Sequence, residues 1–129
     1  MMSHNRILVV EDEDNVRDVL AEFLSYRGYL VETAANGLKA LPKLGEFAPD
    51  LLLTDLQMPG LDGFGLIRWA HEQDPDRAIV VMSALARSEL TDAQVNAYTA
   101  GYVTKPIDPD ELITVIERAI AGSAHGQPS

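Results

Sequence analysis

The sequence predicts an α/β fold in which helices pack on both faces of one parallel sheet. Five short apolar runs alternate with five helical patterns, the order typical of a doubly wound sheet. The runs contain few polar residues, as expected for parallel strands buried on both faces. A length of 129 residues and a hydrophobic content of 47% suit a single domain with one sizeable core.

The first helix of this pattern is well specified. Val16, Val19, Leu20 and Phe23 follow helical spacing with Leu24, and Gly28 supplies a left-handed stop. The whole pattern predicts the following strand-then-helix units: strand 7–10 and helix 14–27, strand 30–34 and helix 37–46, strand 51–54 and helix 63–73, strand 78–82 and helix 88–98, strand 102–104 and helix 109–121.

The other helices are specified unequally. Asp108 and Pro109 predict an N-cap and a first helical residue for the last helix. Pro42 removes a backbone donor inside the second helix, which we expect to be short or kinked. The segment 88–93 has few apolar anchors, so the fourth helix is expected to be weakly held and able to move. Asp14 is interpreted as a cap of the first helix.

Composition excludes several functions. A net charge of -10 and scattered basic residues argue against direct nucleic-acid binding. The chain has no cysteine, and we find no signal peptide or membrane span in it, so we expect a cytoplasmic protein. We expect residues 1–5 to be flexible, 6–121 to form the domain, and 122–129 to be a flexible tail or the start of a linker.

Acidic residues end two of the predicted strands. Asp55 follows the run 51–54 and precedes the turn Met58-Pro59-Gly60, and strand 7–10 runs into Glu11-Asp12-Glu13. Ligands bind at the carboxyl ends of parallel strands. If the two strands are neighbours, three or four carboxylates share one crevice, which is costly without a cation such as Mg²⁺.

Other polar residues follow the remaining strands. Ser83 ends strand 78–82, and Lys105-Pro106 follows strand 102–104. A carboxylate nucleophile, a divalent cation, a lysine and a hydroxyl are the groups that phosphoryl transfer needs. The structural alternatives stay open: the acids could cap helices, Ser83 could bond its own backbone, and Lys105 could be a surface residue. Pro106 suits a cis peptide bond, which favours a functional Lys105 loop.

These residues together resemble the receiver domains of two-component response regulators, including single-domain chemotaxis regulators. The resemblance covers about residues 6 to 121. It is carried by the following positions: Glu11-Asp12, Asp55 with Met58-Pro59-Gly60, Ser83-Ala84, Tyr102 and Lys105-Pro106. It implies a flavodoxin-like (βα)5 fold with strand order 2-1-3-4-5.

The resemblance also implies a mechanism. Asp55 would accept a phosphoryl group from a histidine kinase or a histidine phosphotransfer protein. Mg²⁺ would be held by Asp12, Asp55 and the backbone carbonyl of Gln57, with Glu11 contributing through water. Ser83 and Tyr102 would act as the switch, and the last strand with the last two helices would bind a downstream protein. A phosphorylation-dependent homodimer stays open.

Two other functions compete with this signalling switch. A Mg²⁺-dependent phosphohydrolase with an aspartyl phosphate usually has a second Asp two residues after the nucleophile, where this chain has Gln57. A binding module that accepts no phosphate is disfavoured because all the required side chains are present. Glu11 replaces the more frequent Asp of the family, and Tyr98-Thr99 replaces a frequent Gly-Ala.

Overall fold

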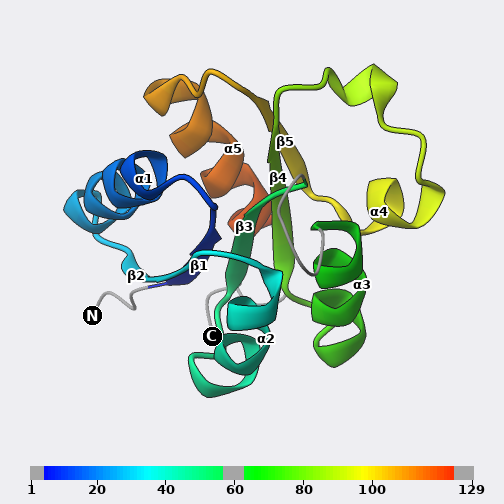
Figure 1. Ribbon diagram of the computed structural model, residues 1–129, viewed down its shortest axis with the longest axis horizontal. Coiled ribbons are helices and arrows are strands. Elements are labelled where there is room, and N and C mark those ends of the chain that lie inside the picture. The colour runs from blue at the N-terminus through cyan, green and yellow to red at the C-terminus, as the bar shows by residue number, and fades with distance from the viewer. Residues whose placement is uncertain (1–4, 57–62, 124–129) are drawn as a thin grey trace.

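The computed structural model describes residues 5–56 and 63–123, and the described parts form a layered α/β domain (Figure 1). The strands and helices in chain order are β1 (Arg6–Val10), α1 (Asp14–Tyr26), β2 (Leu30–Ala34), α2 (Gly37–Glu46), β3 (Leu51–Asp55), α3 (Gly63–Gln73), β4 (Ala78–Ser83), the 3-10 turn η1 (Arg87–Glu89), α4 (Ala93–Tyr98), β5 (Gly101–Thr104) and α5 (Pro109–Ala121). This confirms the predicted alternation of strands and helices.

The sheet has the order β2-β1-β3-β4-β5, and all its neighbouring strands are parallel. The expected order 2-1-3-4-5 is therefore confirmed. All residues of β3 and β4 are buried, as are those of β1 after Arg6, whereas the edge strands β2 and β5 are partly exposed. Continuous apolar runs thus correspond to central strands that are covered on both faces.

Helices cover the two faces of the sheet in two groups (Figure 1). Leu24 of α1 and Ile116 of α5 share one hydrophobic cluster with the strands. Leu44 of α2, Leu66 of α3 and Val95 of α4 belong to the cluster on the other face. Within the described residues, no helix has the length and hydropathy needed to cross a membrane.

Several local predictions about the helices are confirmed. Gly28 follows α1 with a φ of 98°, in the region that favours glycine. The Asp108 side chain accepts a hydrogen bond from the backbone of Asp110, and Pro109 begins α5. The helix α2 has the expected bounds, Gly37 to Glu46, and contains Pro42 without ending there, while a kink at Pro42 stays a prediction.

Three predictions need correction. The helix α4 begins at Ala93 rather than at 88, because η1 precedes it and Asp92 is its N-cap. The cap position of α1 is Glu13, and Asp14 is the first helical residue, where it pairs with Arg17. Val19 is 66% exposed, so the apolar stripe of α1 is only partly covered by the core.

Arg77 holds together three segments at the amino ends of the strands. Its side chain donates hydrogen bonds to the carbonyl oxygens of Pro49 (2.9 Å) and Leu44 (3.2 Å) and to the Gln73 side chain (3.1 Å). The residue is 6% exposed, and burial lowers the pKa of its guanidinium. Buried carbonyl groups need such donors, so Arg77 is a structural residue.

We therefore expect Arg77→Met to lower the free energy of unfolding by about 2–4 kcal/mol, because two buried carbonyls lose a charged donor. Urea unfolding followed by circular dichroism would measure this change. Arg118→Met is the matched control: Arg118 is exposed, and its loss should change stability by less than about 0.5 kcal/mol. Equal effects of the two substitutions would contradict the structural role of Arg77.

Candidate functional site

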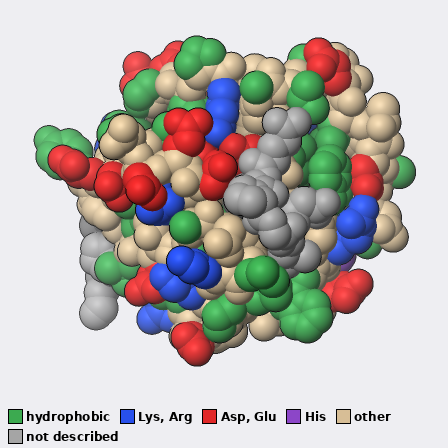
Figure 2. All heavy atoms as spheres, in the orientation of Figure 1, with side chains coloured by type: hydrophobic (Ala, Val, Ile, Leu, Met, Phe, Trp, Pro, Cys, Tyr) green, Lys and Arg blue, Asp and Glu red, His purple; other side chains and the backbone are tan. Residues whose placement is uncertain are grey.

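Three carboxylates meet at the carboxyl ends of two neighbouring strands. Val10 of β1 pairs with Thr54 of β3, so the residue after each lies at the same edge of the sheet. Glu11, Asp12 and Asp55 each bring a carboxylate oxygen to within 4.8 Å of the others. Acidic side chains also gather in the upper left of the face shown in Figure 2. The structure thus brings together the acidic residues that the sequence singled out.

Lys105 links two of these carboxylates. Its Nζ lies 2.6 Å from Oδ2 of Asp55 and 2.7 Å from Oε1 of Glu11. Burial lowers the pKa of the ammonium group, but the hydrogen bonds with Asp55 and Glu11 outweigh burial and raise this pKa above its usual value. Lys105 is therefore a cation of the site, and the alternative of an ordinary surface lysine is wrong.

Glu11 is the most deeply buried acid of the cluster, with no exposed surface. Its Oε2 accepts a hydrogen bond from the backbone of Glu13 at 3.1 Å, while Oε1 binds Lys105. Burial raises the pKa of the Glu11 carboxyl, and the hydrogen bond with Lys105 opposes this effect only in part. By contrast Asp12 is exposed, so its carboxylate is accessible to an ion from solution.

The end of β3 has little free space around Asp55. A Cβ added to Gly63 would lie 2.4 Å from the carbonyl oxygen of Asp55 and 2.5 Å from Cα of Leu56. Only glycine fits this close approach, so α3 starts directly against the strand end. Gln57 and the turn Met58-Pro59-Gly60 lie outside the described residues.

Ser83 ends β4 and is almost fully buried, but its hydroxyl is engaged locally. The Ser83 Oγ accepts a hydrogen bond from the backbone of Leu85 at 3.1 Å, which is the local alternative left open by the sequence. The hydroxyl of Tyr102 donates to the carbonyl oxygen of Leu85 at 2.8 Å. Leu85 therefore connects the two side chains expected to form the switch.

The loop that follows β5 also matches its prediction. The peptide bond between Lys105 and Pro106 is cis, as Pro106 suggested. The backbone of Lys105 donates a hydrogen bond to the carbonyl oxygen of Ser83 at 2.7 Å. The ends of β4 and β5 are thus joined through the backbone at the same edge as the acids.

Sequence reasoning missed Arg17 and the backbone role of Leu85 near the site. Arg17 donates a hydrogen bond to the carbonyl oxygen of Glu11, and Leu85 bridges Ser83 and Tyr102. The Leu85 contacts involve its backbone, which its residue type does not reveal. A basic residue three positions after Asp14 indicates only a local helical ion pair, so nothing in the sequence predicts the hydrogen bond from Arg17 to the Glu11 carbonyl.

The arrangement has the groups of a phosphoryl-transfer site. Asp55 is a carboxylate at the strand end, Lys105 is a cation within hydrogen-bond distance of it, and Asp12 adds an exposed hard oxygen ligand. Lysine and a divalent cation both stabilise phosphoryl oxygens, and a carboxylate can act as the nucleophile.

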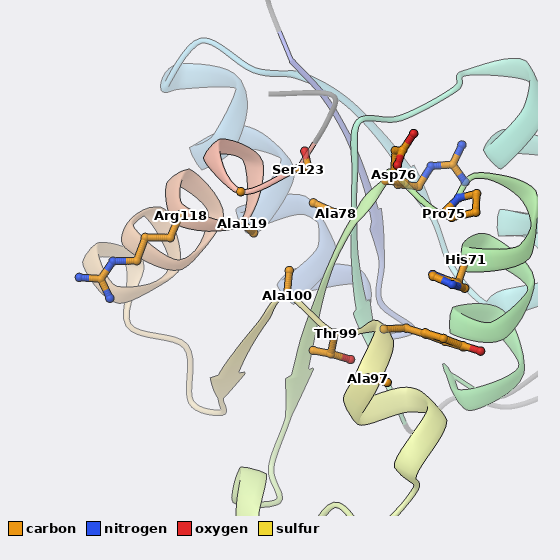
Figure 3. Close-up of a pocket in the computed structure, with 13 residues that line it drawn as sticks. His71, Pro75, Asp76, Ala78, Ala97, Thr99, Ala100, Arg118, Ala119 and Ser123 are labelled. Carbon is orange, nitrogen blue, oxygen red and sulfur yellow. The ribbon is translucent and has the colours of Figure 1, made fainter. Parts of the chain in front are cut away.

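A separate pocket lies at the opposite ends of the strands (Figure 3). It has a volume of about 360 Å³, and its lining includes Ala78, the first residue of β4, and Ala100, which precedes β5. The rings of His71 and Tyr98 stack at one side of it, with centroids 3.7 Å apart. Because the acidic cluster lies at the carboxyl ends, this pocket is not part of the site.

Comparison with known proteins agrees with the fold and with the arrangement of this site. The model of the response regulator receiver domain family matches residues 7–117. The DNA-binding transcriptional regulator NtrC of Escherichia coli is 37% identical over 123 residues, covering 93% of this chain and 26% of that protein. The chain thus spans about a quarter of the length of the first curated relatives it matches.

Two relatives have nearly the length of this chain. Sporulation initiation phosphotransferase F of Bacillus subtilis is 29% identical, covering 91% of this chain and 94% of that protein. The structure of response regulator protein TrrA from Thermotoga maritima in complex with Mg²⁺ and BeF has a TM-score of 0.79 and 34% identity, covering 89% of this chain and 98% of that one. The chain belongs to the response regulator receiver domain family of two-component systems.

Proposed function

We propose that Asp55 is the phosphoacceptor of this receiver domain. The observation that carries the proposal is the ion pair of 2.6 Å between Lys105 Nζ and Asp55 Oδ2 beside Glu11 and Asp12. An Asp55 oxygen would attack the phosphorus of a phosphohistidine, so that an O–P bond forms as the P–N bond breaks. Lys105 would then bind an oxygen of the transferred group.

The donor set of the cluster fits Mg²⁺. Carboxylate oxygens are the ligands that Mg²⁺ prefers, and the cluster provides few of them, which suits an ion that keeps several waters. We infer that Asp12 and Asp55 would bind the ion directly, with the Gln57 carbonyl as a further ligand and Glu11 acting through water. When bound, Mg²⁺ would neutralise negative charge on the phosphoryl oxygens.

Receiver domains take phosphoryl groups from histidine kinases or phosphotransfer proteins, and we infer a partner of this kind. An apolar groove of about 440 Å³ beside Lys105 is lined by residues of α1, among them Val16, Val19 and Phe23. Because the groove begins at the phosphoacceptor site, an apolar helix of the donor could pack there and present its histidine to Asp55. This use would account for the exposure of Val19.

Signalling fits this chain better than turnover of an external substrate. The general acid/base of an aspartyl-phosphate hydrolase would stand two residues after Asp55, where the chain has the neutral Gln57. We infer that the domain assists only its own phosphorylation and dephosphorylation. A cytoplasmic location stays a prediction from the sequence.

The output surface is inferred to consist of α4, β5 and α5. The short helix α4 has one buried residue, Val95, and is tied to α3 by the Arg68–Asp92 ion pair and the stacked rings of His71 and Tyr98. Few buried contacts mean a low cost of movement. Since Ser83 and Lys105 flank this segment, phosphorylation of Asp55 could shift it.

Asp55→Asn should abolish phosphorylation, because the amide is a poor nucleophile. Incubation of the wild-type chain with acetyl phosphate and Mg²⁺ should add one phosphoryl group, detected by mass spectrometry as acid-stable and base-labile. Asp50→Asn is the control: it removes an acid near the other end of β3 and should leave the reaction intact. A phosphorylated Asp55→Asn chain would rule out the assignment.

Asp12→Asn should weaken Mg²⁺ binding at least tenfold, because it removes a direct ligand from a site with few protein ligands. Isothermal titration calorimetry measures the affinity. Glu13→Gln removes the same charge from the same loop, but from a residue outside the carboxylate cluster, and should change the affinity less than threefold. If both variants lose affinity equally, only net charge matters and Asp12 is not a specific ligand.

Beryllofluoride, which mimics the phosphoryl group, should alter amide hydrogen exchange most in residues 83–106. The reason is that the Ser83 hydroxyl would donate to the mimic, and Lys105 would exchange its hydrogen bond with Asp55 for a contact with the mimic. Mass spectrometry with Mg²⁺ alone as reference, and with Asp55→Asn as control, measures the change. Changes confined to α1 and α2 would contradict the proposed output surface.

A further inference from the structure

Arg17 lies in the first turns of α1 and reaches back over the acidic loop. Its Nη1 donates a hydrogen bond of 2.9 Å to the carbonyl oxygen of Glu11, and its Nη2 lies 2.6 Å from Oδ1 of Asp14. The Arg17 side chain is only 16% exposed, whereas that of Asp14 is 81% exposed. The guanidinium fork therefore joins the loop to the start of the helix.

The contacted carbonyl belongs to the peptide that joins Glu11 to Asp12. Because β1 ends at Val10, this carbonyl lies beyond the strand, although the N–H of Glu11 still donates to Ala34 at 3.1 Å. The hydrogen bond from Arg17 thus fixes the plane of the Glu11–Asp12 peptide. That plane determines the direction in which the Asp12 side chain leaves the backbone.

The charge of Arg17 and its hydrogen bond to Glu11 should have opposite effects on the affinity of the site for a cation. The positive charge of Arg17, which contacts the Glu11 carbonyl oxygen, repels Mg²⁺, so charge alone predicts tighter Mg²⁺ binding when Arg17 is removed. The hydrogen bond to Glu11, however, holds Asp12 in place for the ion, and its loss predicts weaker binding. Residues that orient metal ligands commonly change the affinity by about 10- to 100-fold.

We propose that Arg17 is a positioning residue for Mg²⁺, acting on Asp12 through the carbonyl of Glu11. This inference rests on the proposed function of the site. Arg17 does not touch the ion or the phosphoryl group. Its effect is confined to the affinity for Mg²⁺, so saturating Mg²⁺ compensates for its loss.

Arg17→Gln should weaken Mg²⁺ binding about tenfold, as measured by calorimetry. The loss of positive charge alone would instead make Mg²⁺ binding tighter. The double variant Arg17→Gln with Asp14→Asn keeps the wild-type net charge and should also bind more weakly than wild type. Asp14→Asn alone, which leaves the Arg17 hydrogen bond to Glu11 in place, should remain within threefold. Phosphorylation by acetyl phosphate should slow in both Arg17 variants at low Mg²⁺ and recover at saturating Mg²⁺.

Unchanged or tighter Mg²⁺ binding by Arg17→Gln overturns the inference, as does a phosphorylation rate that saturating Mg²⁺ does not restore. Thermal unfolding shows whether each variant is folded. If Arg17→Gln is unfolded, Arg17→Lys replaces it: the lysine keeps the charge but lacks the fork that joins the Glu11 carbonyl to Asp14, so this variant should bind Mg²⁺ more weakly than wild type, and equal binding overturns the inference. Failure of the wild-type chain to bind Mg²⁺ would instead overturn the proposed function itself.

Discussion

The ion pairs of Lys105 with Asp55 and Glu11 hold the carboxyl edge of the sheet together. Without a cation, carboxylates crowded within 4.8 Å would repel one another, and the buried Glu11 would carry an uncompensated charge. Lys105 directly follows β5, which is not a neighbour of β1 or β3 in the sheet. Its two contacts therefore connect strands that share no backbone hydrogen bonds, and they make the site depend on the whole sheet.

The parts of the fold around this site differ in how firmly they are held. The central strands are buried on both faces, and Gly63 brings α3 directly against the backbone of Asp55, so Asp55 has a rigid support. The segment between β4 and β5 is held differently, by single side-chain contacts such as the Arg68–Asp92 ion pair, which is partly exposed. Such exposed pairs add little stability. Under the proposed function, phosphorylation of Asp55 would therefore be expressed in the element that costs least to move.

The sequence predicts the strands well because central strands need nothing beyond a short apolar run. It predicts that Glu11, Asp12, Asp55 and Lys105 lie together because parallel strands present their carboxyl ends at one edge. It failed where tertiary context decides. The helix α4 begins later than expected because Asp92 caps it and the apolar pattern before Asp92 is weak. Val19 follows the helical spacing of the apolar residues in α1, yet it is exposed. The partners of Arg77 and the backbone contacts of Leu85 are missed because they join segments or atoms that residue type does not mark.

The local hydrogen bond of Ser83 has a consequence for switching. The Ser83 Oγ accepts the backbone N–H of Leu85, whereas binding a phosphoryl oxygen on Asp55 would use the Ser83 hydroxyl as a donor. The carbonyl oxygen of Leu85 accepts a hydrogen bond from the Tyr102 hydroxyl, so a shift of this loop alters the environment of Tyr102 as well. A ligand changes an equilibrium only by its difference in interaction between two states. A charged phosphoryl oxygen is a strong acceptor for the Ser83 hydroxyl, which would gain a charge-assisted hydrogen bond only in the phosphorylated state, and this difference is what can drive the coupled rearrangement.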